Sequence, residues 1–320
     1  MGELMLRQAI GEAIGEEMER DDRVFLLGED VAPGGVFAVT PGLADRFGHD
    51  RVIDTPISEM AFTSAAFGAA LRGLRPVVEI MFADFLALVL DTLSNQAAKY
   101  PYFSNHQSTM PITIRTAVGA GVRFGAIHSE TPTSWLLGIP GLKLVAPSNP
   151  ADAKALVKAA IRDEQPVIVF EHKLLYGRKG EVPDGIEPAR IGEAATVREG
   201  GDVTLVAAMA MVDVATTAAD ELAGNGMSAE VIDLRTIRPL DRETIVASAK
   251  KTGRVVVVEE GPPTGGYSPE VLSLVLEHAP GARGRRVTMP DIPVPFSAPL
   301  EDAVLPSPAR VVRAAEQLLS

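Results

Sequence analysis

Residues 54–59, Asp-Thr-Pro-Ile-Ser-Glu, form the stretch of the sequence with the clearest chemical content. They place one carboxylate, Glu59, directly after a predicted strand at 51–54 and before an apolar helix that begins near Met60. A carboxylate between a strand's carboxyl end and a helix start can be held in a cleft, where it can trade protons with a cofactor. The alternative is structural: Ser58 caps the helix, and Glu59 is a first-turn acid that matches the helix dipole.

A second acidic group, Gly28-Glu29-Asp30, ends the first buried strand of the sequence. Acids at the carboxyl end of a parallel strand point into the crevice where ligands usually bind, so Glu29 is a candidate binding residue. The alternative is turn chemistry, in which Asp30 and the following Pro33-Gly34-Gly35 only reverse the chain.

Two aromatic residues, Phe82 and Phe85, follow a later strand. Together they could form a face for a flat heterocycle, with Asp84 capping the next helix. Packing into the core is the commoner fate of two phenylalanines, and that alternative stays open.

His128 follows the glycine-rich run 119–125 and is one of five histidines. A loop histidine that titrates near neutral pH suits proton transfer to or from a reacting carbonyl. A solvated or hydrogen-bonding histidine is the alternative. The glycine run itself does not match a dinucleotide fingerprint, because no helix opens at its third glycine.

The helix end at 160–166 is the last candidate. Backbone carbonyls freed at a helix C-terminus can ligate a hard cation, and Asp163 could complete the shell. An ordinary helix stop explains the same residues.

The predicted elements alternate between short apolar strands and helices, which predicts an α/β fold with parallel sheets covered by helices on both faces. In the first half we expect strands at 24–27, 51–54, 75–80, 112–115, 143–146 and 167–170, and helices at 4–20, 58–71, 84–100 and 150–162. After a polar, turn-rich stretch at 176–189, the second half predicts strands at 203–207, 229–233, 254–259 and 286–289, and helices at 212–225, 241–251, 268–278 and 307–319. We therefore predict two α/β domains, 1–185 and 201–320, joined by a linker region at 186–200.

Composition narrows the class of protein. The chain has 320 residues, 46% of them hydrophobic, a net charge of −12 and no cysteine. The charge argues against nucleic-acid binding, and the lack of cysteine excludes disulfides and thiolate chemistry. Neither a signal peptide nor an apolar span is evident, so we expect no membrane attachment and a cytoplasmic location.

Taken together, these segments resemble one family, the β subunits of thiamine-diphosphate-dependent 2-oxo acid dehydrogenases. These subunits belong to the decarboxylating component of the pyruvate, branched-chain and acetoin dehydrogenase complexes. The resemblance spans essentially the whole chain and rests on GEDV (28–31), GGVF (34–37), DTPISE (54–59), GLRPVVEI (73–80), FADF (82–85), PGLKLVAPSNPADAK (140–154), AAIRDEQPVI (159–168), EHKLLYG (171–177), EVIDLRTIRPLD (230–241) and KKTGRVVVVEE (250–260). It implies a pyrimidine-binding α/β domain followed by a transketolase-type C-terminal domain.

The resemblance also implies roles for individual residues. Glu59 matches the glutamate that hydrogen-bonds the cofactor's aminopyrimidine ring, which drives the tautomer whose exocyclic nitrogen removes the thiazolium C2 proton. His128 matches a loop histidine thought to act on the substrate or in acyl transfer to the lipoyl arm. The pyrimidine pocket is implied to be lined by Ile57, Ser58, Phe82 and Phe85, with Glu29 beside it. A structural potassium site of some members corresponds to Ile112, Ala160, Ile161, Asp163 and Gln165.

The family's metal signature for the cofactor diphosphate, a GDG segment followed later by Asn, does not occur; Gly201-Asp202-Val203 is the nearest approach. The chain is therefore expected to carry half a site. An α subunit would supply the diphosphate and magnesium half in an α2β2 heterotetramer, and a lipoyl-bearing acyltransferase would be a further partner.

Two departures from the family pattern leave the substrate open. Glu130 follows Ser129 where the family usually has Gln, and Phe85 replaces a Tyr of many branched-chain members. Pyruvate, a branched-chain 2-oxo acid and acetoin all remain candidate substrates. The competing hypotheses are a half-enzyme like transketolase or deoxyxylulose-phosphate synthase, and a non-catalytic assembly subunit.

Overall fold

The computed structural model describes residues 2–319 of the chain. These residues form two compact units. The first unit comprises the residues up to Val118 together with Gly138–Ile191. The second comprises Gly119–Leu137 and the residues from Gly192 onward. The segment that carries His128 therefore belongs to the second unit, although it lies between two stretches of the first in the sequence.

The first unit is built on a parallel sheet whose strands run in the order β6-β7-β5-β4-β2-β3. Most of the strand residues are buried, as expected for strands covered on both faces. The prediction of a parallel α/β fold is confirmed. The bounds are β2 Val24–Gly28, β3 Val52–Asp54, β4 Arg75–Phe82, β5 Thr113–Val118, β6 Lys143–Val145 and β7 Val167–His172.

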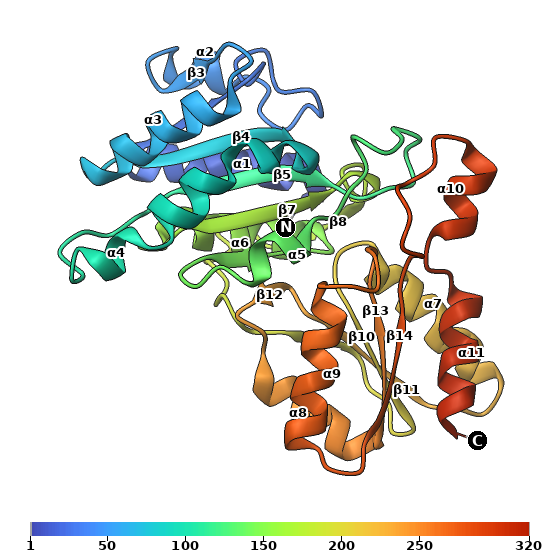
Figure 1. The fold of residues 1–320 in the computed structure, drawn as a ribbon. Helices are drawn as coiled ribbons and strands as arrows, with labels where there is room; N and C mark the ends of the chain where they lie inside the picture. The colour runs from blue at the N-terminus through green and yellow to red at the C-terminus, as the bar shows by residue number, and fades with distance from the viewer. Residues whose placement is uncertain (1, 320) are drawn as a thin grey trace. The chain divides into compact units, whose positions relative to one another are not determined.

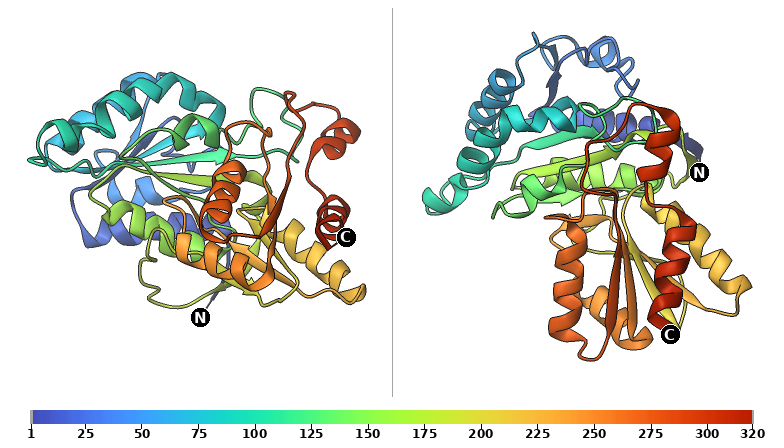
Figure 2. Two further views of the ribbon diagram at one scale, coloured as in Figure 1. Left: turned by 60° about the horizontal axis from the view of Figure 1, so that its bottom comes forward. Right: turned by 45° about the vertical axis from the view of Figure 1, so that its right-hand side comes forward.

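Helices cover both faces of this sheet (Figures 1 and 2). Helices α1 (Leu6–Arg20) and α6 (Pro150–Arg162) pack against each other, and α3 (Glu59–Leu71) packs against η1 (Ala83–Val89) and η2 (Thr92–Ala97). The helix predicted at 84–100 is thus replaced by a 3₁₀ segment and a π segment. The Asn95 side chain donates to the Asp91 carboxylate at 2.7 Å, a contact between side chains four residues apart that supports a helical turn, so the stretch remains helical in character although its hydrogen-bond pattern is not that of a regular α-helix.

The polar stretch after Tyr176 is more structured than its composition suggested. Strand β8 (Lys179–Val182) pairs antiparallel with β1 (Gly2–Met5), where the sequence predicted helix from Leu4. Because the two strands are far apart in the sequence, no local sequence pattern predicts their pairing. The unit also contains the short helices α2 (Leu43–Phe47), α4 (Tyr100–Phe103) and η3 (Lys173–Leu175).

The second unit has a smaller sheet in the order β14-β13-β10-β11-β9, parallel except for β9. Helices α7 and α11 contact each other on one face, and α8 and α9 contact each other on the other face (Figure 2). The bounds are β9 Ala195–Arg198, β10 Val203–Ala207, β11 Ala229–Asp233, β12 Thr236–Arg238, β13 Arg254–Val258, β14 Arg283–Val287, α5 Thr133–Leu137, α7 Met211–Gly224, α8 Arg242–Thr252, α9 Tyr267–His278, α10 Ala298–Val304 and α11 Pro308–Leu319.

Candidate active site

Glu59 is the first residue of α3, and its side chain is only 8% exposed. Ser58 precedes the helix, but its hydroxyl makes no capping bond and is exposed. Its backbone carbonyl accepts the Phe62 N–H at 3.1 Å, as in any helix start. The capping role considered for Ser58 is therefore absent, and Glu59 is a buried acid rather than a solvated one.

Two hydrogen bonds hold the loop that carries Glu59 beside the loop that carries Glu29. The Thr55 N–H donates to the Gly28 carbonyl at 3.0 Å, and the Ala32 N–H donates to Asp54 Oδ1 at 2.8 Å. These bonds join the carboxyl ends of β2 and β3, which are adjacent parallel strands. The neighbouring strand ends thus bring the two predicted acids together, as the rule for ligand sites in open sheets predicts.

The electrostatics of Glu29 reflect this proximity. Partial burial raises the pKa of Glu29, and the negative charges of Glu59 and Asp30 raise it further. A carboxyl group whose pKa is raised by burial and by neighbouring negative charges is typical of sites that handle protons.

Phe82 and Phe85 pack edge to face, with ring centroids 5.9 Å apart. Phe82 is buried at the end of β4, whereas Phe85 in η1 is partly exposed. On its other side Phe82 meets Phe37 edge-on at 5.6 Å, and Phe37 stacks on Tyr176 at 5.0 Å. Neither Phe37 nor Tyr176 was predicted as a site residue, because each is remote in sequence from Phe82.

A fully buried ionic group lies behind these rings. Arg115 in β5 donates to both carboxylate oxygens of Glu171 at 2.8 and 2.7 Å, and it also pairs with Glu79. Tyr176 donates its hydroxyl to Glu171 at 2.8 Å, which connects the ionic group to the aromatic row. Burial raises the pKa of Glu171 against the opposing charge of Arg115, and burial raises that of Tyr176 well above its usual value.

Ile57, the remaining predicted pocket residue, is 78% exposed, and Met60, which directly follows Glu59 in the first turn of α3, is 62% exposed. Both flank Glu59 in the sequence. A buried acid beside two exposed apolar side chains is the arrangement expected where a second surface completes a site.

The residues of the predicted potassium site gather at the end of α6. The carbonyl oxygens of Ile161 and Asp163 accept hydrogen bonds from Arg75 at 3.0 and 3.1 Å, and the Ile112 carbonyl accepts the Val167 N–H at 3.0 Å. The Asp163 carboxylate accepts from the Gln165 N–H at 2.9 Å and from Lys143 at 2.5 Å. Each carbonyl oxygen has two lone pairs and can take a further ligand, but Arg75 and Lys143 already place positive charge beside this set of oxygens.

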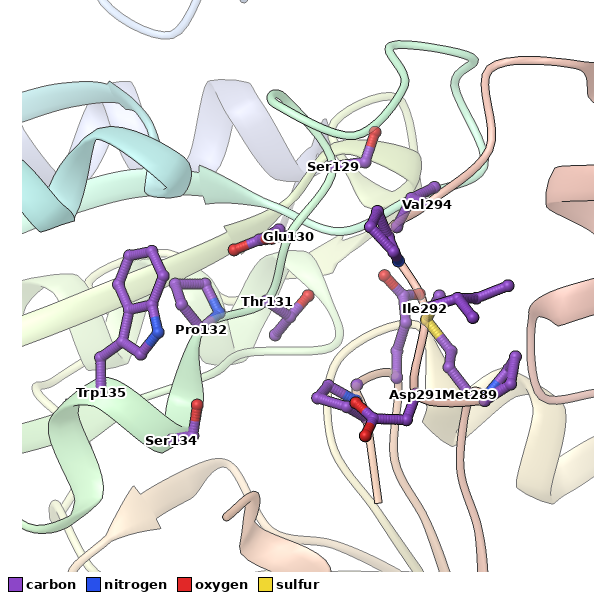
Figure 3. A pocket seen from close by; sticks show the side chains of 15 residues that line it. Ser129, Glu130, Thr131, Pro132, Ser134, Trp135, Met289, Asp291, Ile292 and Val294 are labelled. Carbon is purple, nitrogen blue, oxygen red and sulfur yellow. The ribbon is translucent and has the colours of Figure 1, made fainter. Parts of the chain in front are cut away.

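His128 lies in the second unit and is partly exposed, and its backbone N–H donates to the Gly125 carbonyl at 3.5 Å. Residues 129–135, which directly follow His128 in the sequence, wall one side of a cavity of about 340 Å³. Residues 289–294 wall the other side (Figure 3). Within the described chain, the buried hydroxyls of Ser129 and Thr131 have no hydrogen-bond partner. Thr131 points into the space opposite Ile292 and Val294 (Figure 3).

Among residues 2–319, no group of three or more His, Cys, Asp or Glu side chains lies close enough together to hold a metal ion. Over the same residues, no helix has the length and apolar character that a membrane span needs. A cytoplasmic location stays a prediction.

The two units define a transketolase-type architecture. The family model for the transketolase pyrimidine binding domain matches residues 2–179, and the model for the transketolase C-terminal domain matches residues 192–311. The chain is also similar to a solved structure described as a split gene transketolase, inactive beta4 tetramer. The TM-score is 0.82 at 26% identity, and the match covers 99% of each chain.

Curated relatives narrow the class. The chain is 45% identical to the β subunit of acetoin:2,6-dichlorophenolindophenol oxidoreductase of Cupriavidus necator, over 99% of this chain and 97% of that protein. It is 44% identical to the pyruvate dehydrogenase E1 component subunit beta of Rickettsia felis (99% and 98% covered) and to the 2-oxoisovalerate dehydrogenase subunit beta of Bacillus subtilis (97% of each). The chain belongs to the family of β subunits of 2-oxo acid and acetoin dehydrogenases, which is a thiamine-diphosphate-dependent family.

Proposed function

We propose that this chain is the catalytic β subunit of a heteromeric 2-oxo acid or acetoin dehydrogenase. It would take part in thiamine-diphosphate-dependent oxidative decarboxylation of a 2-oxo acid, or in cleavage of acetoin, followed by acyl transfer to a lipoyl arm. The observation that carries the proposal is the buried Glu59 at a strand end, held beside Glu29 by backbone hydrogen bonds. Family membership and the transketolase-type architecture support it.

The residues of the first unit suit the pyrimidine end of thiamine diphosphate. Glu59 offers a carboxyl group to a ring nitrogen, and Phe82 with Phe85 offers an aromatic surface that is partly exposed. When bound, the cofactor supplies the electron sink that a 2-oxo acid lacks as it loses carbon dioxide. The protein's part is to hold the proton that Glu59 shares with the ring and to keep the ring in one orientation.

We propose that an α subunit supplies the other half of the site, including the magnesium-bound diphosphate, in an α2β2 assembly. The lack of a GDG signature in the sequence supports this division. So does the exposure of Ile57 and Met60 beside Glu59. The similar solved structure of a split gene transketolase is itself described as an inactive β4 tetramer. A lipoyl-bearing acyltransferase is the expected acceptor component.

We also propose a structural potassium ion at the end of α6, held by oxygens of Ile112, Ala160, Ile161, Asp163 and Gln165. Thermal unfolding in potassium chloride and in sodium chloride at equal ionic strength tests this proposal. Potassium should raise the unfolding midpoint of the wild type and should have no such effect on Asp163→Asn. Equal midpoints of the wild type in the two salts would remove the proposal.

Glu59→Gln in the assembly reconstituted with the α subunit tests the central role. We expect a loss of about 10²-fold or more in cofactor-dependent decarboxylation with the fold intact, because the carboxyl proton relay is gone. Glu243→Gln is the control for a change of charge at a helix start, since Glu243 is an exposed acid in the first turn of α8. Near-normal activity of Glu59→Gln would overturn the mechanism.

A binding measurement tests the half site. The isolated chain should bind thiamine diphosphate weakly, even with magnesium, and the α subunit should restore tight binding. Strong magnesium-dependent binding by the chain alone would contradict the shared site. Turnover by the reconstituted pair with pyruvate, branched-chain 2-oxo acids and acetoin, using an artificial electron acceptor, would identify the substrate.

A further inference from the structure

The loop between β5 and α5, which carries His128, has an irregular backbone. Gly119, Gly121 and Gly125 have φ values of 92°, 94° and 72°, and Arg123 has a φ of 66°. Arginine rarely adopts this left-handed conformation, which persists only where surrounding contacts impose it. The loop therefore depends on external contacts for its shape.

Glu260 provides the first of these contacts. It follows β13 in the second unit and is 4% exposed. Its Oε1 accepts the Ala120 N–H at 2.7 Å, so a buried charge fixes the backbone at the start of the loop. Glu260 also lines the cavity walled by Ser129 and Thr131.

Glu301 provides the second contact. It is fully buried in the first turn of α10, and its Oε1 accepts the Gly121 N–H at 2.7 Å. Its other oxygen pairs with Arg123 at 2.5 Å, and Asp302 pairs with the same guanidinium at 2.7 Å. The residue with the strained backbone is thus the one that the acids of α10 hold.

The far side of the loop is also packed. A side chain at Gly125 would lie 3.3 Å from the Phe296 ring, in a segment shortly before α10. The Gly125 carbonyl accepts a hydrogen bond from the backbone N–H of His128. An unbroken series of contacts therefore runs from Glu260 and Glu301, through the glycines, to His128.

We propose that Glu301 and Glu260 are positioning residues for His128. A carboxylate that accepts backbone N–H groups fixes the path of the main chain, which apolar packing alone would leave free to slide. The acids act through the main chain of the loop, which sets the position of His128. This inference rests on the proposed function only for the role of His128.

Hydrogen–deuterium exchange of the α2β2 assembly tests the structural step. Glu301→Ala should speed exchange of the loop amides at 119–128 by about tenfold or more, because Gly121 and Arg123 lose their acceptor. Glu230→Ala is the matched control, since Glu230 is another buried acid of this unit, paired with Lys251. Unchanged exchange of the loop in Glu301→Ala would overturn the inference.

A double-mutant comparison tests the link to His128 in both dye-linked decarboxylation and acylation of a lipoyl domain. Glu301→Ala should reduce the same reaction that His128→Ala reduces, and the double variant should be no slower than His128→Ala alone. Glu230→Ala combined with His128→Ala should show independent effects. If the loss of activity in Glu301→Ala/His128→Ala equalled the product of the two single-variant losses, Glu301 would act independently of His128.

Glu301→Gln is a milder variant if the alanine variant does not fold. It keeps an oxygen for the Gly121 N–H and loses the charge opposite Arg123, so we expect a smaller effect in the same reaction. The two proposals fail separately. A reconstituted wild type without thiamine-dependent activity would refute the function, and the exchange data would still decide on the loop.

Discussion

Tyr176 stacks on Phe37 with ring centroids 5.0 Å apart and an interplanar angle of 25°. Its hydroxyl meanwhile binds Glu171 at 2.8 Å, so one side chain joins the buried ionic group to the aromatic row that ends at Phe85. The expected cofactor surface is therefore connected through Tyr176 to a buried, hydrogen-bonded ionic group. This relationship makes Phe37 and Tyr176 the first residues to test outside the predicted site.

Phe37→Leu should weaken thiamine diphosphate binding to the assembly by up to about tenfold, since each aromatic contact contributes about 0.5–1.5 kcal/mol. Titration calorimetry checks this. Tyr176→Phe keeps the stacked ring and should have the smaller effect on affinity. Phe47→Leu, which removes a ring packed against Arg46, is the control. Equal effects of Phe37→Leu and Phe47→Leu would contradict a specific role for the aromatic row.

Arg115→Met should destabilise the first unit by about 3–5 kcal/mol, because Glu79 and Glu171 are left as buried, uncompensated charges. Urea unfolding measures this change. The triple variant Glu79→Gln/Arg115→Met/Glu171→Gln removes all three charges and should recover much of the loss. If the triple variant were less stable than Arg115→Met, the buried charges of Glu79 and Glu171 would not be what destabilises Arg115→Met.

Glu29→Gln should make the protein more stable at neutral pH. The pKa of Glu29 is raised by burial and by the charges of Glu59 and Asp30, so its ionised form destabilises the folded state. That penalty is absent below the ordinary glutamate pKa and develops as pH rises through the higher folded value. Unfolding midpoints of the variant and the wild type should therefore converge in acid and separate toward pH 7. A variant that is less stable at pH 7 would contradict this assignment.

Asp21→Asn should lower stability at neutral pH. Hydrogen bonds from the Arg23 side chain and backbone depress the pKa of Asp21 to about 2, against the opposing effect of burial. The stabilisation that ionised Asp21 gives the folded state is present above the ordinary aspartate pKa and is lost as pH falls toward 2. The difference in thermal unfolding midpoint between the wild type and Asp21→Asn should therefore disappear over that pH range. Asp22→Asn, whose side chain is fully exposed, should show no comparable change.

The sequence predicted the regular parts of the fold closely. Helix α6 and strands β10 and β11 lie where periodicity and apolar runs placed them, because these elements bury faces defined by their own residues. The π segment at 92–97 and the pairing of β1 with β8 were not predicted. Both depend on contacts that no local window contains.

The candidate site was predicted in part for a similar reason. Strand-end position was enough to bring Glu29 and Glu59 together, since adjacent parallel strands share an edge. The ionic group was missed, although a signal was available: Glu79 lies within a predicted apolar strand, Arg115 ends another, and Glu171 directly follows a third. Charged residues in such runs need partners, and only the strand order identifies which strands supply them.

The exposed side chains of Ile57 and Met60 have a consequence for the cell that makes this chain. Water-facing apolar groups that await a partner are also what chaperones and proteases recognise in an unassembled subunit. Copies synthesised in excess of the α subunit would be removed or would self-associate. Under the proposed assembly, the amount of α subunit limits how much of this chain accumulates. The cell would therefore need to produce the two polypeptides in balanced amounts.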